Sequence, residues 1–100
     1  MSEKSEFEIG SGNVFEDLGL PNAKELFIKS SIAIAIHREI QARGLKQREA
    51  AALMEIPQPH VSNIVRGRLD EFSIERLIRL LNKFDLDVQM SIVPKSALAG

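Results

Sequence analysis

Five polar side chains gather in one ten-residue stretch, QPHVSNIVRG, which spans residues 58–67. They are Gln58, His60, Ser62, Asn63 and Arg66. Amide, hydroxyl, imidazole and guanidinium groups donate or accept hydrogen bonds at modest reach. Val61 and Ile64 stand three positions apart among them, a spacing that turns one side of a helix inward. The stretch therefore predicts a short helix with an apolar inner side and a hydrogen-bonding outer side.

The two histidines, His37 and His60, are the candidates for catalysis or metal binding. The chain has no cysteine, and neither an HExxH motif nor a paired-carboxylate spacing accompanies these residues. We expect no catalytic residue, no bound metal and no cofactor. His37 is interpreted as a polar residue of a long helix, and His60 as a contact or solvent-facing residue.

Two short helices, roughly residues 47–54 and 58–66, would position the polar groups, with Glu55, Ile56 and Pro57 between them. Where two such helices cross, the first needs small or apolar inward residues and the second needs an inward stripe. The turn between them needs an apolar plug. The residues that fit these positions are Ala50, Ala51, Met54, Ile56, Val61 and Ile64.

A long helix should precede this pair and another should follow it. The long helix begins after Asn22, an expected N-cap with Glu25 as its capping-box partner, and ends at Gly44. Its two apolar stripes predict that two faces are covered, one by its own domain and the other by the N-terminal arm or a second subunit. Ser73 should cap the following helix, whose apolar residues recur at helical spacing.

Near the end of the chain the apolar residues recur at every second position instead of at helical spacing. Val88, Met90 and Ile92 alternate with polar residues, and Pro94 ends the run, which predicts a β-strand. A lone strand leaves its backbone hydrogen bonds unmade, so this one needs a partner. Residues 7–9 or the same strand of a second chain could supply it.

Charge and composition indicate one domain, with an acidic arm at residues 1–21, the domain at residues 22–93 and a tail at residues 94–100. Residues 1–25 carry six carboxylates against two lysines, whereas residues 37–68 carry six basic residues against three glutamates. Such a basic segment around the short helices suits a phosphate-bearing partner. No signal peptide and no apolar run of membrane-spanning length is visible, so a cytoplasmic protein is expected.

Residues 45–67, LKQREAAALMEIPQPHVSNIVRG, resemble the helix-turn-helix of the lambda-repressor-like (Cro/CI, XRE) family. The resemblance implies an all-α bundle of about five helices with a short C-terminal β-strand, and a second motif helix that enters the DNA major groove. It implies base-facing positions at Gln58, Pro59, Ser62 and Asn63. Backbone contacts are implied for Lys46, Gln47, Arg66 and Arg68, with Gln47 also bracing Gln58, while His60 could donate to either kind of partner.

Three residues depart from the family pattern. Lys46 replaces the usual Thr cap of the first motif helix, and Pro57 replaces the usual Ser cap of the second. Glu55 replaces the Gly of the turn, where a left-handed conformation would strain it by roughly 1 kcal/mol. These departures affect the docking geometry and leave the motif recognisable.

A wider resemblance, over about residues 10–93, is to the host-inhibition-of-growth antitoxins, whose partners are RelE-like messenger-RNA-cleaving toxins. It implies a homodimer that represses its own promoter and binds such a toxin. Pairing of the C-terminal strand across a two-fold axis would make Val88, Met90 and Ile92 the dimerisation residues, and the dimer is expected to bind a two-fold operator in double-stranded DNA. An alternative is a protein-interaction module in which the helix-turn-helix is only a scaffold. In that case the acidic arm and the long helix would bind a basic partner protein.

Overall fold

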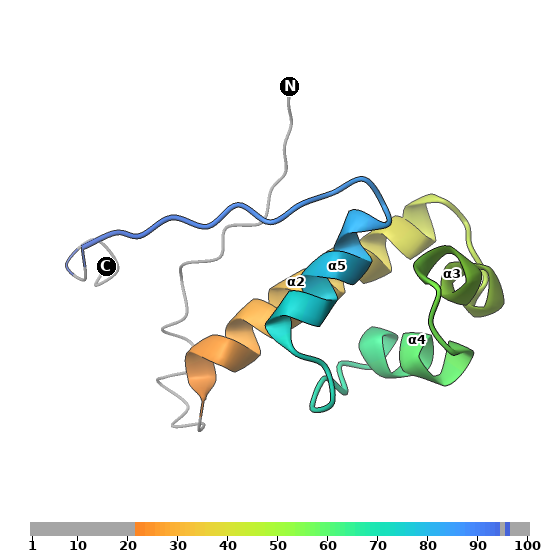
Figure 1. Cartoon of the computed structure of the whole chain (residues 1–100), viewed down its shortest axis with the longest axis horizontal. Coiled ribbons are helices and arrows are strands. Elements are labelled where there is room, and N and C mark those ends of the chain that lie inside the picture. Colours follow the sequence, from red (N-terminus) through yellow and green to blue (C-terminus); the bar gives the residue numbers. More distant parts are fainter. Residues whose placement is uncertain (1–21, 95, 97–100) are drawn as a thin grey trace.

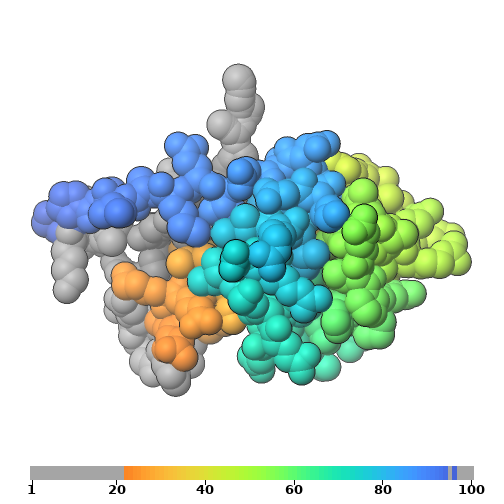
Figure 2. Space-filling model, viewed as in Figure 1, coloured from red at the N-terminus to blue at the C-terminus, as the bar shows by residue number. Residues whose placement is uncertain are grey.

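Four helices form the part of the chain that the computed structural model describes, residues 22–94 and 96. They are α2 (Ala23–Ala42), α3 (Gln47–Met54), α4 (Gln58–Val65) and α5 (Ile74–Asn82). α2 packs against both α5 and α4, and α3 packs against α4 (Figure 1). α3 and α4 lie together at one end of the molecule (Figure 2). The all-α prediction is confirmed, with four helices in these residues instead of about five.

α2 is the central helix, and its own domain covers both of its predicted apolar stripes. Ile32 and Ile36 are almost completely buried, and Ala33 and Ala35 on either side of them are buried as well. The two covering elements are α5 and α4 of the same chain, so no second subunit is needed for these faces. Ile34, on the opposite side of α2, remains 47% exposed. None of the helices among the described residues is both long and apolar enough to cross a membrane.

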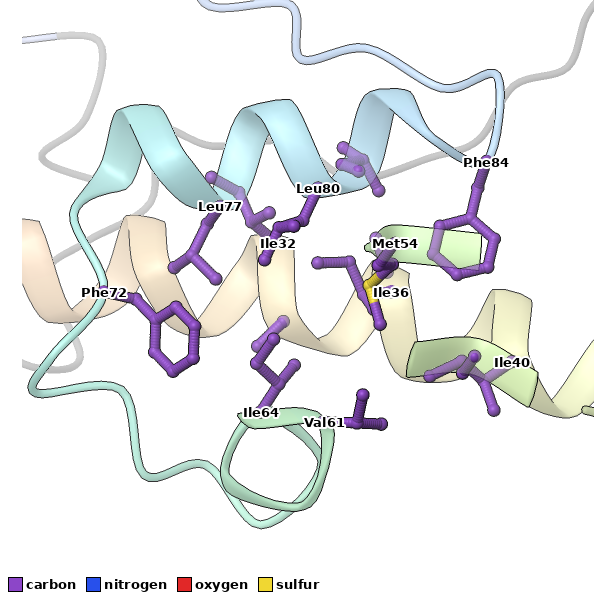
Figure 3. Packing of buried hydrophobic residues seen from close by; sticks show 14 of the residues in the cluster. Ile32, Ile36, Ile40, Met54, Val61, Ile64, Phe72, Leu77, Leu80 and Phe84 are labelled. Carbon is purple, nitrogen blue, oxygen red and sulfur yellow. The ribbon is translucent and has the colours of Figure 1, made fainter. Parts of the chain in front are cut away.

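The core unites the four helices around the inner side of α4. Val61 and Ile64 are fully buried and point from α4 toward α2 (Figure 3). Met54 reaches the same cluster from α3, and Leu77 reaches it from α5. Ala50 is completely buried, so the first motif helix is small where the second packs on it. Of the residues predicted to form the motif core, Ala50, Ala51, Met54, Val61 and Ile64 are buried in this cluster, and Ile56 is partly buried against it.

Three of the helices end in the same left-handed turn, the Schellman motif. At the end of α4 the amide of Arg68 donates to the Asn63 carbonyl at 2.8 Å, and the amide of Gly67 donates to the Ile64 carbonyl at 3.1 Å. Gly67 has φ of +77°, which explains why the polar stretch stops at Arg-Gly. Equivalent bonds close α2 at Gly44 and α3 at Glu55.

The helix starts follow the predictions less closely. Asn22 occupies the predicted N-cap position, and its carbonyl accepts from the Leu26 amide at 2.9 Å. Its φ is +55°, however, and its side chain makes no capping hydrogen bond. Glu25 instead pairs with Lys29 at 3.0 Å, one turn further along α2. Ser73 is confirmed as a cap, because its Oγ accepts a hydrogen bond from the Arg76 amide at 3.0 Å. The missing cap of Lys46 is compensated in part by Glu49, whose Oε1 accepts from the Lys46 amide at 2.8 Å.

Residues 88–92 do not form a strand within the described chain, so that prediction is not confirmed. After α5 the side chain of Asn82 donates to the Leu86 carbonyl at 2.7 Å and ties down the exit from the helix. Val88 still packs on the core, but Met90 is 50% exposed and Ile92 is fully exposed. Beyond this exit the chain turns back and, in the view of Figure 1, runs without helix above α5 and α2 toward the side where α2 begins. A strand needs a second strand beside it, and no such neighbour occurs among residues 22–94.

The left-handed turns generate a paired prediction for stability. Glu55→Gly should raise the free energy of unfolding by about 0.5–1 kcal/mol, because Glu55 has φ of +60°. Gly67→Ala should lower it by about 1 kcal/mol through backbone strain alone, since an added Cβ would meet no atom within 4 Å. Urea denaturation followed by circular dichroism measures both changes.

Glu55→Gln is the matched control. It keeps the strained backbone but removes the exposed ion pair between Glu55 and Lys83, whose atoms lie 3.5 Å apart. Exposed pairs contribute little, so this variant should unfold close to the wild-type urea concentration. If Glu55→Gln stabilised the protein as much as Glu55→Gly, the charge of Glu55, and not its left-handed backbone, would be the source of the destabilisation.

Candidate nucleic-acid interface

The outer face of α4 carries most of the predicted reading residues. With Val61 and Ile64 turned inward, 100° per residue places Pro59, Ser62 and Asn63 on the opposite side and Gln58 at its edge. Pro59 and Gln58 are exposed, whereas Ser62 and Asn63 are half-buried. The side chains of Gln58, Ser62 and Asn63 make no hydrogen bond to any other described residue. Their donors and acceptors are therefore available to an external partner.

Arg66 and Arg68 flank the end of this face. The Schellman turn at Gly67 brings the backbone of Arg68 back onto Asn63, so both arginines stay close to the end of α4. Both are exposed, and neither pairs with a carboxylate in the described part of the chain. They are two fixed positive charges next to the hydrogen-bonding face.

The start of α3 adds another basic group. Lys46 and Arg48 are exposed there, on either side of the half-buried Gln47. Gln47 and Gln58 are not hydrogen-bonded to each other in this structure, so the predicted brace between them is not formed. Arg48 was not among the predicted contacts, although the count of basic residues in this segment included it. Its exposure in the first turn of α3 makes it a further candidate contact.

Arg43 was included in the same basic segment but has a different role. Its Nη2 donates to the Phe84 carbonyl at 2.8 Å, and its Nε lies 3.2 Å from Glu39 Oε1. Its guanidinium carbon lies 5.1 Å from the centroid of the Phe84 ring. Arg43 thus joins the end of α2 to the end of α5 and contributes little charge to the α4 face.

His60 is separated from the other predicted reading residues. It is half-buried on the flank of α4, with its ring edge-on to Phe72 at 5.8 Å between centroids. Its Nδ1 lies 3.4 Å from Nη2 of Arg76 on α5. The structure therefore groups His60 with residues of α5 and of the link that precedes it, and not with Ser62 and Asn63.

The turn between the motif helices directs its carboxylate toward another element. Oε1 of Glu55 lies 3.5 Å from Nζ of Lys83, at the end of α5. The charge that would oppose a phosphate partner is paired there with a lysine. Pro57 has φ of −61° and precedes α4 without a side-chain cap, as its residue type dictates.

Neither histidine belongs to a metal-binding group. In residues 22–94 and 96, no group of three or more His, Cys, Asp or Glu side chains is arranged to hold a metal ion. His37 lies on α2 and lines a shallow groove of about 210 Å³ with Ile34, Val65 and Leu69. It is a half-buried polar residue of the long helix, as interpreted from its sequence position.

Comparisons with known proteins agree with this geometry. Residues 14–93 match a family model described as a helix-turn-helix domain, a match that begins within the predicted N-terminal arm. No curated protein matches the chain. A solved structure, whose name assigns it to the XRE family of transcriptional regulators, is 41% identical in sequence. That match covers 75% of this chain and 84% of the other, with a TM-score of 0.69. The chain belongs to the XRE family of helix-turn-helix transcriptional regulators.

Proposed function

We propose that this protein is a sequence-specific DNA-binding repressor whose helix α4 enters the major groove. The observation that carries the proposal is the division of α4 into two sides. Val61 and Ile64 are fully buried, while the outward side chains of Gln58, Ser62 and Asn63 have no hydrogen-bonding partner in the described chain. A major groove admits one helix and presents a distinct donor and acceptor pattern for each base pair.

The outward groups divide by chemistry into base readers and backbone anchors. Gln58 and Asn63 carry amides, which can bind the N6 and N7 edge of adenine in a bidentate manner. Lys46, Arg48, Arg66 and Arg68 are exposed cations at the two ends of the motif, suited to phosphates. We place the readers at the first and middle turns of α4, and the anchors around them.

The exposed C-terminal segment supports a two-fold assembly. Met90, Ile92 and Val93 are among the large apolar side chains left exposed, and residues 89–93 have no backbone partner strand in the described chain. Antiparallel pairing of this segment with its copy would satisfy the backbone and cover those side chains together. We infer a homodimer that binds a two-fold operator with half-sites about 34 Å apart, or a multiple of that distance.

A more specific form of the proposal is a cytoplasmic antitoxin that represses its own operon and binds a RelE-like toxin. It is supported by the resemblance of residues 10–93 to small antitoxin-type regulators and by the acidic balance of residues 1–25. The alternative is a protein-interaction module that uses the helix-turn-helix only as a scaffold.

Alanine substitutions at four positions distinguish the backbone anchors from the base readers. Arg66→Ala and Arg68→Ala should weaken binding to every DNA sequence and reduce the salt slope of log K by about one unit each. Gln58→Ala and Asn63→Ala should instead lose preference at one base position, at a cost of about 1–3 kcal/mol. Fluorescence anisotropy at several salt concentrations, on an operator selected from random DNA, measures both effects.

Two exposed residues away from α4 provide matched controls. Arg79→Ala removes an arginine that pairs with Glu75 on α5, and Gln41→Ala removes an amide from the last turn of α2. Both variants should keep the wild-type salt slope and base preference. The division into readers and anchors is wrong if the variants at Gln58, Asn63, Arg66 and Arg68 all lose the same affinity on every DNA tested.

A proline in the exposed segment tests the assembly. Ser91→Pro removes a backbone donor in a part of the chain that is already extended, so the fold of one protomer should tolerate it. It should shift the protein from dimer to monomer in multi-angle light scattering and weaken binding to a two-fold operator. Ser91→Ala, which keeps the donor, should remain dimeric. Unchanged dimerisation of Ser91→Pro at low protein concentration would exclude pairing through this segment.

A gel mobility shift tests the antitoxin proposal. The protein should retard the DNA upstream of its own gene, and a small basic product of the neighbouring gene should change that shift. Binding of the neighbouring protein without any shift of the promoter DNA would favour the scaffold alternative.

A further inference from the structure

A three-residue cluster joins the recognition helix to α5. Phe72, in the link between the helices, is only 3% exposed and forms the base of the cluster. His60 of α4 meets this ring edge-on, with an interplanar angle of 83°. Arg76 of α5 lies over the same ring, with its guanidinium carbon 5.0 Å from the centroid. The histidine and the arginine also contact each other, with Nη2 3.4 Å from Nδ1.

The chemistry of this contact favours one tautomer of the histidine. A guanidinium group has only donors, so the contact requires a lone pair on Nδ1 of His60. This is the tautomer of imidazole that carries its proton on Nε2. The edge-on packing on Phe72 and the stacking of Arg76 on the same ring are both favourable aromatic geometries. Arg76 is itself placed by the hydrogen bond from its amide to Ser73 at the start of α5.

The cluster lies where it can restrain one movement of α4, a roll about its own axis. Val61 and Ile64 lie three residues apart on the inner side of α4, so they hold the helix along one line. Contacts on the two flanks oppose a roll about that line. Val65 is partly buried against the core on one flank, and His60 contacts Phe72 and Arg76 on the other. Since a helix with its side chains has a radius of about 5–6 Å, a roll of roughly 10° moves the outer side chains by about 1 Å. A shift of that size would spoil a bidentate hydrogen-bond pair with a base.

We propose that Arg76 is a positioning residue for base recognition: through His60 it sets the roll of α4 and so the placement of Gln58 and Asn63. The role rests on the proposed function, because it needs a base-reading α4. It assigns to α5, which lies outside the helix-turn-helix, a share in sequence discrimination without a contact to DNA.

The first test needs no DNA. In Arg76→Met the aliphatic stem can still cover Phe72, but the donor to Nδ1 is lost. Nitrogen-15 spectra of the imidazole at about pH 8, above the ordinary titration range of histidine, report the tautomer. Wild-type His60 should carry its proton on Nε2, and Arg76→Met should show a larger Nδ1-protonated share. Arg79→Met, an exposed arginine on the same helix, should leave the His60 spectrum unchanged.

The second test measures discrimination. Arg76→Met should lower affinity for the selected operator by about tenfold, the scale of one weakened bidentate base contact, and leave affinity for random DNA within about twofold. Its salt slope should match that of Arg79→Met. Arg76→Lys keeps the charge but lacks the planar fork, so it should also discriminate less well than wild type.

Three results would overturn the role of Arg76. An unchanged His60 tautomer in Arg76→Met would show that the two side chains are not coupled. A salt slope reduced by about one unit, with full recovery in Arg76→Lys, would make Arg76 a phosphate anchor. Unchanged discrimination in a folded Arg76→Met would show that the roll of α4 is set elsewhere. Failure of the proposed function itself is distinguishable, because the wild-type protein would then bind no selected DNA.

Discussion

The burial of Val61 and Ile64 is the constraint on which the rest of this structure depends. These two side chains hold α4 against α2, and Met54 holds α3 against the same cluster. The helical repeat then decides the direction of every polar group of α4, because each residue is rotated by about 100° from the one before it. The unpartnered amides on the outer face are a consequence of this anchoring. The small inner residues of α3 are equally necessary, since a larger side chain at Ala50 would separate the two helices.

Much of this arrangement could be predicted from the sequence, because it follows from short-range patterns. The bounds of α3 agree with the prediction, and α4 ends one residue earlier than expected. Gly44 and Gly67 lie just past their helices, where a left-handed residue closes the turn, and Glu55 adopts the same conformation despite its side chain. The inward pair on α4 was recognisable from its spacing of three. Periodicity and turn residues therefore account for the motif and its core.

What could not be predicted depends on partners distant in the sequence. His60 has the residue type of a DNA contact, but Phe72 and Arg76, twelve and sixteen positions later, draw it to the flank of α4. Arg43 counts toward the basic segment of the sequence, yet its guanidinium donates to the carbonyl of Phe84, 41 positions later in the chain. Asn22 stands at the N-cap position as predicted, but its backbone is left-handed and its side chain makes no capping hydrogen bond, which residue preference alone does not reveal. The alternation of residues 88–92 indicated a strand, but a strand is a property of two segments, and one pattern specifies only one of them.

The exit from α5 is held by Arg43 on the Phe84 carbonyl and by Asn82 on the Leu86 carbonyl. The chain therefore leaves the bundle in a direction set by two side chains, at a site remote in the sequence from the recognition helix. In a dimer formed through the segment beyond it, this exit would fix the orientation of each helix-turn-helix relative to the dimer axis. Substitutions in the few residues between Asn82 and Val88 could then alter the spacing between the halves of the target while leaving the choice of bases untouched.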